Sequence, residues 1–164
     1  MSPGEPVSPG EPVRLWPDDA GEVLTLQRAA YATEAQAHGD LAMPPLTQTL
    51  DQLRAELADP AVTAWGIHQN GRLVASVRVR LAEPDVAEVG RLVVAPDRQG
   101  HGLGSGLLRA AEARLPRRVS LVRLFTGEHS HANLRLYRRL GYRETGRTCA
   151  GDYELVHLAK PLPS

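Results

Sequence analysis

A glycine-rich turn, RQGHGLGSG at residues 98–106, limits what this chain can fold into more than any other stretch of its sequence. It follows the apolar run LVVAP and precedes a leucine-rich helical pattern. Glycines at 100, 102 and 104 let successive backbone N–H groups approach a ligand, and the N-terminus of the following helix adds partial positive charge. A strand, a bare turn and a helix in this order are suited to binding phosphate.

The spacing of these glycines separates three kinds of phosphate-binding turn. The pattern G-x-x-x-x-G-K-[ST] needs a lysine that is missing here, and G-x-G-x-x-G fails from Gly100 and from Gly102. The pattern Q-x-x-G-x-G fits, with Gln99, Gly102 and Gly104 at its fixed positions.

Apolar periodicity predicts an α/β fold with a mixed sheet and helices on its faces. Asn70-Gly71 between two alternating runs indicates a hairpin. The predicted order is β-α-α-β-β-β-α-β-α-β-β. The expected strands are 13–16, 62–69, 72–81, 86–94, 119–126, 142–148 and 153–159, and the expected helices are 20–37, about 50–58, 102–115 and 132–140.

The 164 residues, 42% of them hydrophobic, are enough for one domain with its own core. Residues 1–12 repeat the unit SPGEPV and predict a disordered tail, so the domain is expected over 13–164. The single cysteine, Cys149, has no internal disulfide partner, and no run is apolar enough for a membrane span. We therefore expect a cytoplasmic protein with no membrane partner.

Charge is balanced overall but uneven along the chain. Residues 1–97 hold 7 Arg and 14 Asp or Glu, a net −7, whereas residues 98–147 hold 11 Arg and 3 Glu, a net +8. Such asymmetry fits an anionic ligand beside the basic part, although two ordinary solvated faces would have the same counts.

The chain resembles the GNAT superfamily of acyl-CoA-dependent N-acyltransferases from about Val13 to Lys160. The turn at 99–104 is similar to the family's first signature. NLRLYRRLGYRE at 133–144 is similar to the second, a short helix with Asn at its start and Tyr four residues later. The resemblance implies a sheet whose central strands splay apart, and the transfer of an acetyl group from acetyl-CoA to a primary amine in a ternary complex.

The resemblance also implies which residues bind acetyl-CoA. Backbone of the strand before the turn would pair with pantetheine, the turn and Ser105 would bind the pyrophosphate, and Asn133 would steady the pantetheine arm. Arg98 and Arg135 would serve the ribose phosphate. The expected set is Leu92, Val93, Val94, Gln99, Gly100, His101, Gly102, Leu103, Gly104, Ser105 and Asn133.

Two residues are the candidates for catalysis. By resemblance, the Tyr137 hydroxyl lies near the thioester sulfur, where it protonates or hydrogen-bonds the departing thiolate. Glu88 alternates onto the same side as Leu92 and Val94 and is the candidate base, with a water chain as its alternative. His129 or His131 could also serve as the base, and their HSH motif has no partner cluster for a metal.

The acceptor amine is expected to contact the first two helices, where Glu34, His38 and Asp40 give an acidic bias that would favour a cationic amine. An inactive acyl-CoA-binding module of the same fold is the alternative function. Nucleic-acid binding is disfavoured because aromatic residues make up only 4% of the chain. An open sheet edge near the C-terminus would allow a homodimer.

Overall fold

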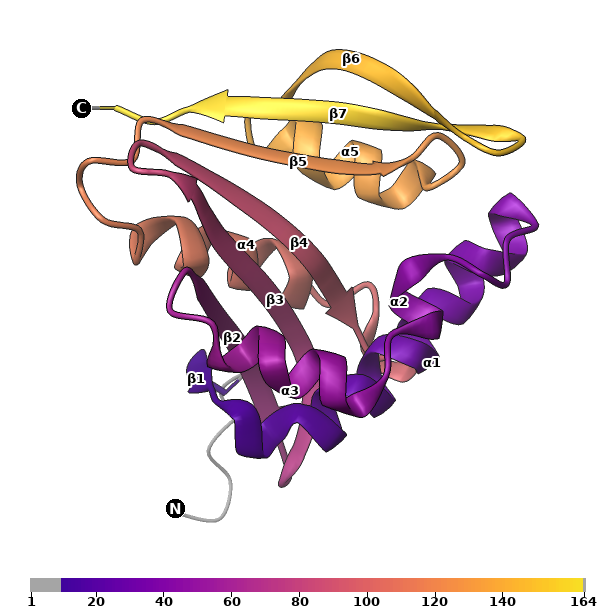
Figure 1. Ribbon diagram of the computed structural model, residues 1–164, viewed down its shortest axis with the longest axis vertical. Helices are drawn as coiled ribbons and strands as arrows, with labels where there is room; N and C mark the ends of the chain where they lie inside the picture. Colours follow the sequence, from indigo (N-terminus) through magenta and orange to yellow (C-terminus); the bar gives the residue numbers. More distant parts are fainter. Residues whose placement is uncertain (1–9, 164) are drawn as a thin grey trace.

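The alternating apolar residues of 62–94 form the centre of a seven-stranded sheet in the computed structural model, which describes residues 10–163 (Figure 1). The strands are β1 (Val13–Leu15), β2 (Val62–Gln69), β3 (Arg72–Glu83), β4 (Val86–Val94), β5 (Leu121–Gly127), β6 (Arg143–Ala150) and β7 (Tyr153–Pro161). The helices are α1 (Ala20–His38), α2 (Pro44–Thr47), α3 (Leu50–Ala58), α4 (Leu103–Ala113) and α5 (His131–Arg139). The predicted mixed α/β fold is confirmed.

Three short elements were not in the expected order. Pro17–Asp19 and Pro96–Arg98 form 3₁₀ turns, and α2 occupies part of the stretch expected to be a turn. Proline is favoured in the first turn of a helix because its fixed φ suits the helix and its missing N–H is not needed there. Pro44 and Pro45 therefore start a helix where their sequence had indicated only a break. Most of the predicted tail, residues 1–9, lies outside the described residues.

The strand order is β1-β2-β3-β4-β5-β7-β6, and only the central pair β4–β5 is parallel. That pair is short, because register is kept only from Val86–Leu121 to Glu88–Arg123. Beyond Glu88 the two strands separate (Figure 1). The splay implied by the family resemblance is therefore present, and it lies beside the turn that precedes α4.

A β-bulge interrupts β4 just after this point. Arg78 pairs with Gly90 and Ser76 pairs with Val93, so Arg91 and Leu92 together oppose the single residue Val77. Arg91 has a φ of 55°, a left-handed conformation that in such bulges usually falls to glycine. The bulge shifts the side-chain alternation of the strand from this point on.

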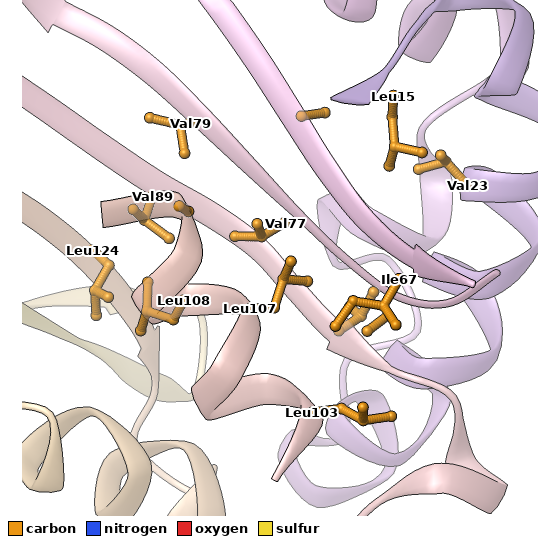
Figure 2. Packing of buried hydrophobic residues seen from close by; sticks show 14 of the residues in the cluster. Leu15, Val23, Ile67, Val77, Val79, Val89, Leu103, Leu107, Leu108 and Leu124 are labelled. Atoms are coloured by element: carbon orange, nitrogen blue, oxygen red, sulfur yellow. The ribbon is translucent and has the colours of Figure 1, made fainter. Parts of the chain in front are cut away.

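The main core lies between the sheet and α4. Leu107 and Leu108 of α4 are fully buried and lie against Val77 and Val89 of the central strands (Figure 2). On the opposite face, α1 and α3 cover the β2–β4 half of the sheet (Figure 1). Within residues 10–163, none of the helices has the length and apolar character needed to cross a membrane.

Leu107→Ala should lower the free energy of unfolding by about 2–5 kcal/mol, since it removes a fully buried side chain and leaves a cavity under the sheet. Leu41→Ala is the matched control, because Leu41 is 80% exposed and its truncation should change stability by less than about 0.5 kcal/mol. Urea denaturation of both variants measures the difference. Equal stabilities would contradict this account of the core.

Candidate active site

The first of two cavities lies beside the end of β4 and has a volume of about 470 Å³. Its walls come from the middle of α1, the end of β4, the glycine turn and one face of α5. The lining residues are Ala30, Tyr31, Thr33, Glu34, Leu92, Val93, Val94, Arg98, Gln99, Gly100, Gly102, Leu103, Gly104, Ser105, Ala132, Asn133, Leu136 and Arg139.

Positive backbone φ angles shape the glycine turn. Gly100 and Gly102 have φ of 84° and 80°, and Gly102 is the residue on which α4 begins. The Gln99 side chain donates a hydrogen bond to the Val94 carbonyl (3.3 Å) and so ties the turn to the end of β4. A Cβ on Gly104 would lie 3.4 Å from the Leu136 side chain. The turn therefore lies close to β4 and to α5, and its residues line the cavity.

Two arginines add positive charge to this cavity. Arg98 contributes a buried Nε without a hydrogen-bond partner among residues 10–163, and its nearest carboxylate, Asp97, is 3.9 Å away. Arg139 donates to the Ser105 hydroxyl (3.3 Å) at the start of α4. Guanidinium groups and the N-terminus of a helix both favour phosphate. The first cavity therefore fits the diphosphate of an acyl-CoA.

The second cavity, of about 580 Å³, adjoins the first and shares Tyr31, Glu34, Leu92 and Asn133 with it. Its other walls come from the end of α1, the segment leading into α2, the bulge of β4, the end of β5 and the turn between β6 and β7. The remaining lining residues are His38, Gly39, Asp40, Met43, Pro44, Pro45, Arg78, Val89, Gly90, Arg91, Phe125, Thr126, Gly127, Tyr137, Ala150, Gly151, Asp152, Tyr153 and Leu155.

Tyr137 lines the second cavity one helical turn after Asn133 and is only 5% exposed. Burial, together with the nearby Tyr31 and Glu34, raises the pKa of its phenol far above the usual value. The group is therefore protonated at every pH at which an amine acceptor would be assayed. In this state it can donate a hydrogen bond to an atom bound in the second cavity.

Hydrogen bonds tie the end of α1 to the opposite wall of the second cavity. Ser130 donates to the Glu34 carboxylate, and the Tyr153 hydroxyl donates to Asp40 (2.7 Å). Burial and this bond to Asp40 raise the pKa of Tyr153 to about 12. The acidic residues of this segment therefore already accept hydrogen bonds from the protein's own hydroxyl groups.

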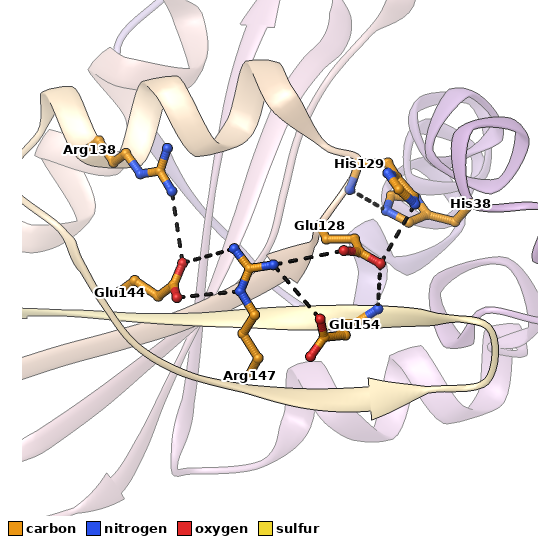
Figure 3. Close-up of polar contacts among 7 residues, drawn as sticks. All are labelled: His38, Glu128, His129, Arg138, Glu144, Arg147 and Glu154. Carbon is orange, nitrogen blue, oxygen red and sulfur yellow. Dashed lines mark hydrogen bonds and ion pairs between the residues drawn. The ribbon is translucent and has the colours of Figure 1, made fainter.

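His38 makes the most constrained of these contacts. Its Nδ1–H donates to the Glu34 backbone carbonyl (2.8 Å), and its Nε2 accepts from the backbone N–H of His129 (3.0 Å; Figure 3). These partners assign a neutral ring with its proton on Nδ1, because a carbonyl can only accept and an N–H can only donate. Figure 3 also shows Arg147 of β6 among Glu128, Glu144 and Glu154. The ion pair of Arg147 with Glu128 connects β6 to the loop between β5 and α5.

Glu88 is not brought to either cavity. Its carboxylate pairs with Arg123 of β5, and its side chain is 41% exposed. The expectation that it shares a face with Leu92 and Val94 is wrong because of the bulge. Cross-strand partners share a face, and Glu88 opposes Arg80 whereas Val94 opposes Ala75, an odd number of residues away on β3.

The other predicted residues fall close together. Every residue of the expected acetyl-CoA set lines the first cavity except His101, which is exposed within the turn. Arg135 and the rings of His129 and His131 line neither cavity, and Arg139 takes the place expected for Arg135. Among residues 10–163, no group of His, Cys, Asp and Glu could hold a metal ion. Glu34, His38 and Asp40, expected at the acceptor, line the second cavity. The sequence missed Tyr31, although Tyr31 and Glu34 share a helix face by spacing.

A model of the acetyltransferase (GNAT) family matches residues 25–142, which include the glycine turn and the whole of α5. The chain belongs to the GNAT acetyltransferase family. Membership supports an acyl-CoA-dependent acyltransferase.

Solved structures share the fold of this GNAT chain. The ribosomal-protein-S18-alanine N-acetyltransferase of Escherichia coli is 22% identical, with a TM-score of 0.75, over 92% of each chain. The PaiA N-acetyltransferase of Thermoplasma acidophilum, solved in complex with coenzyme A, is 16% identical, with a TM-score of 0.74, over 93% of this chain and 98% of that one. An acetyltransferase of Thermus thermophilus is 21% identical, with a TM-score of 0.70, over 93% and 96%. At these identities the likeness shows the fold alone.

Gly127→Ala should destabilise the protein by about 1–3 kcal/mol, because its Cβ would lie within 2.5 Å of the His38 ring and push it away from His129. Gly146→Ala is the matched control, since a Cβ there meets nothing within 4 Å. Thermal melting of both variants tests this. A Gly127 variant as stable as the Gly146 variant would show that the His38 contact does not hold α1 in place.

Proposed function

We propose that this GNAT protein transfers an acetyl group from acetyl-CoA to a primary amine by direct transfer within a ternary complex. The observation that carries the proposal is the junction of the two cavities at Tyr31, Glu34, Leu92 and Asn133. A donor in the first cavity and an amine in the second would meet there without a covalent enzyme intermediate. Cys149, the only cysteine, is exposed on β6 and lines neither cavity, which favours direct transfer.

The first cavity would hold acetyl-CoA, which supplies the acetyl group as an activated thioester. The end of β4 would offer backbone groups from Leu92 to Val94 to the pantetheine arm, because β5 has already separated from this edge. The turn from Gln99 to Ser105, with His101 binding through its backbone alone, would hold the diphosphate. Asn133 would orient the pantetheine arm where the cavities meet.

Tyr137 would donate its phenolic proton as a hydrogen bond to the sulfur of the departing thiolate. Its raised pKa makes full proton transfer to a thiolate unfavourable, since a free thiol ionises near pH 8.5. A hydrogen bond that strengthens as charge develops on sulfur needs no such transfer and still stabilises the transition state. Tyr137 is thus proposed as a donor rather than as a general acid.

Glu34 is the carboxylate at the junction and would receive the incoming ammonium group and its proton. It lines both cavities, and its hydrogen bond from Ser130 fixes the carboxylate without neutralising its charge. Glu88, the base predicted from the sequence, would need a chain of waters to act from its pair with Arg123. Assays of Glu34 and Glu88 variants distinguish the two carboxylates.

Tyr137→Phe should lower kcat about 100-fold and leave the KM for acetyl-CoA within a factor of three, because only the hydrogen bond to the leaving group is lost. Thiol release from acetyl-CoA across a panel of amines measures both constants. An unchanged kcat would remove Tyr137 from the reaction. Acetyl-CoA binding with no turnover for any amine would favour an inactive acyl-CoA-binding module instead.

Glu34→Gln should lower kcat/KM for the amine about 10- to 100-fold, since glutamine can still accept from Ser130 but cannot take a proton. Glu88→Gln should change it less than about threefold, because that side chain lies at a surface ion pair. Both variants are assayed with the best amine of the panel. The reverse ranking would assign the base to Glu88.

A further inference from the structure

The second cavity, where the acceptor amine would bind, contains an arginine that forms no ion pair with the described residues. Arg78 and Arg91 both line it, on β3 and in the bulge of β4. Arg78 pairs with Glu56 (2.9 Å), whose second carboxylate oxygen accepts from Gln48 (3.1 Å). Arg91 has no ion pair with any carboxylate of residues 10–163. These three charged groups therefore sum to +1.

Both guanidinium groups are partly withdrawn from water. The Nε atoms of Arg78 and Arg91 are buried and have no hydrogen-bond partner in the described part of the chain. Burial is the largest cause of a lowered pKa of Arg91, and Arg78 lowers it further, whereas the neighbouring Tyr31 and Glu56 act in the opposite direction. Two like charges that share a desolvated wall are unfavourable unless an anion joins them.

The backbone is built to present this pair. Arg91 holds a left-handed φ of 55°, which costs an L-residue about 1–2 kcal/mol and is typical of functional sites. Gly90, opposite Arg78, leaves room for the Arg78 guanidinium, because a Cβ there would lie 2.5 Å from Nη2. The missing side chain at position 90 therefore allows the Arg78 guanidinium to lie against β4.

We infer that the acceptor amine carries an anionic oxyacid group, such as a carboxylate or a phosphonate, which binds Arg91 with Arg78 beside it. The inference rests on the proposed function and narrows its substrate to amino-acid-like molecules. Arg91 directly precedes Leu92, which lines both cavities, so the anion would lie a short distance from the junction where the amine must react. The ammonium end faces Glu34 and the anionic end faces Arg91.

An acceptor with an anionic group differs from the cationic acceptor that the acidic bias of the first two helices had indicated. Glu34, Asp40 and Asp152 line the cavity as well. Asp40 and Glu34 each accept a hydrogen bond from a hydroxyl group, of Tyr153 and Ser130 respectively, which fixes their positions and leaves their charges in place. A polyamine would place a second positive charge beside Arg91. An amine with one anionic group matches the cavity at both ends.

The test compares acids with their uncharged derivatives. Thiol release from acetyl-CoA is measured with the twenty L-amino acids, their carboxamides and aminomethylphosphonate. The best acceptor should carry an anion, and its carboxamide should have a KM roughly 10- to 100-fold higher, as expected for the loss of a hydrogen-bonded charge pair. Carboxamides or simple amines that match the acids would overturn the inference and leave the proposed acetyl transfer intact.

Arg91→Gln should raise the KM for the acid by a similar factor and change the KM values for the carboxamide and for acetyl-CoA less than threefold. Arg80→Gln is the matched control, because Arg80 lies two residues from Arg78, pairs with Asp59 and lines neither cavity. Equal effects of Arg91→Gln on acid and carboxamide would overturn the inference. Melting temperatures show whether each variant is folded.

A binding measurement tests the anion site at Arg91 even if no amine is acetylated. Calorimetric titration of the CoA-saturated protein with N-acetyl-amino acids and their amides should show tighter binding of the acids, lost in Arg91→Gln. Equal affinities would contradict the inference. If the protein binds acetyl-CoA and the acids but acetylates nothing, the proposed function fails while the anion site stands.

Discussion

The separation of β4 from β5 is the constraint on which the rest of the site depends. The two strands share register over three residue pairs only, whereas β5 pairs with β7 along its whole length. From Gly90 onward, β4 is bonded to β3 on one side and faces a cavity on the other. Backbone groups left open at a strand edge are favourable only when water or another chain bonds them. A pantetheine arm has the amides to do so.

The bulge at Arg91 and this separation act together. A bulge bends a strand and increases its twist, which turns the end of β4 away from the direction of β5. The same residues that open the edge therefore direct a guanidinium group into the adjoining cavity. Donor and acceptor would be positioned by one short backbone segment, so their relative placement would not depend on loop closure.

Much of this architecture could be predicted because it is written in local patterns. The alternation over 72–94, the Asn-Gly hairpin and the glycine spacing each occupy one short stretch, and β4 has its predicted bounds of 86–94. The backbone of the turn at 99–104 follows from glycines that need positive φ. Nine of the residues expected to bind acetyl-CoA lie between positions 92 and 105 and line one cavity because they are nearly contiguous; the tenth, Asn133, comes from α5.

The remaining features depend on contacts between distant parts of the chain or on one irregular residue. His38 meets His129 across 91 positions, and nothing in either local sequence indicates the partner. The face of β4 on which Glu88 lies was mispredicted because strict alternation assumes a strand without a bulge. A glycine at position 91 would have indicated a bulge, but the residue there is an arginine. Tyr31 was missed, although Glu34 and His38 of the same helix were expected at the acceptor, because helical spacing gives a face but not the element that this face covers.

The net charge of a segment can be counted from the sequence, but the charges that line a cavity are known only from the structure. Residues 1–97 have an acidic net charge although they contain Arg78 and Arg91, and the net charge does not show where these two arginines lie. In the fold, Glu34 and Asp40 of that segment accept hydrogen bonds from hydroxyl groups and Glu56 pairs with Arg78, whereas Arg91 lines the cavity without an ion pair among the described residues. A net charge of −7 therefore coexists with a site that attracts an anion, because Coulomb interactions in a partly desolvated cavity depend on the few groups that line it and not on the average of the segment.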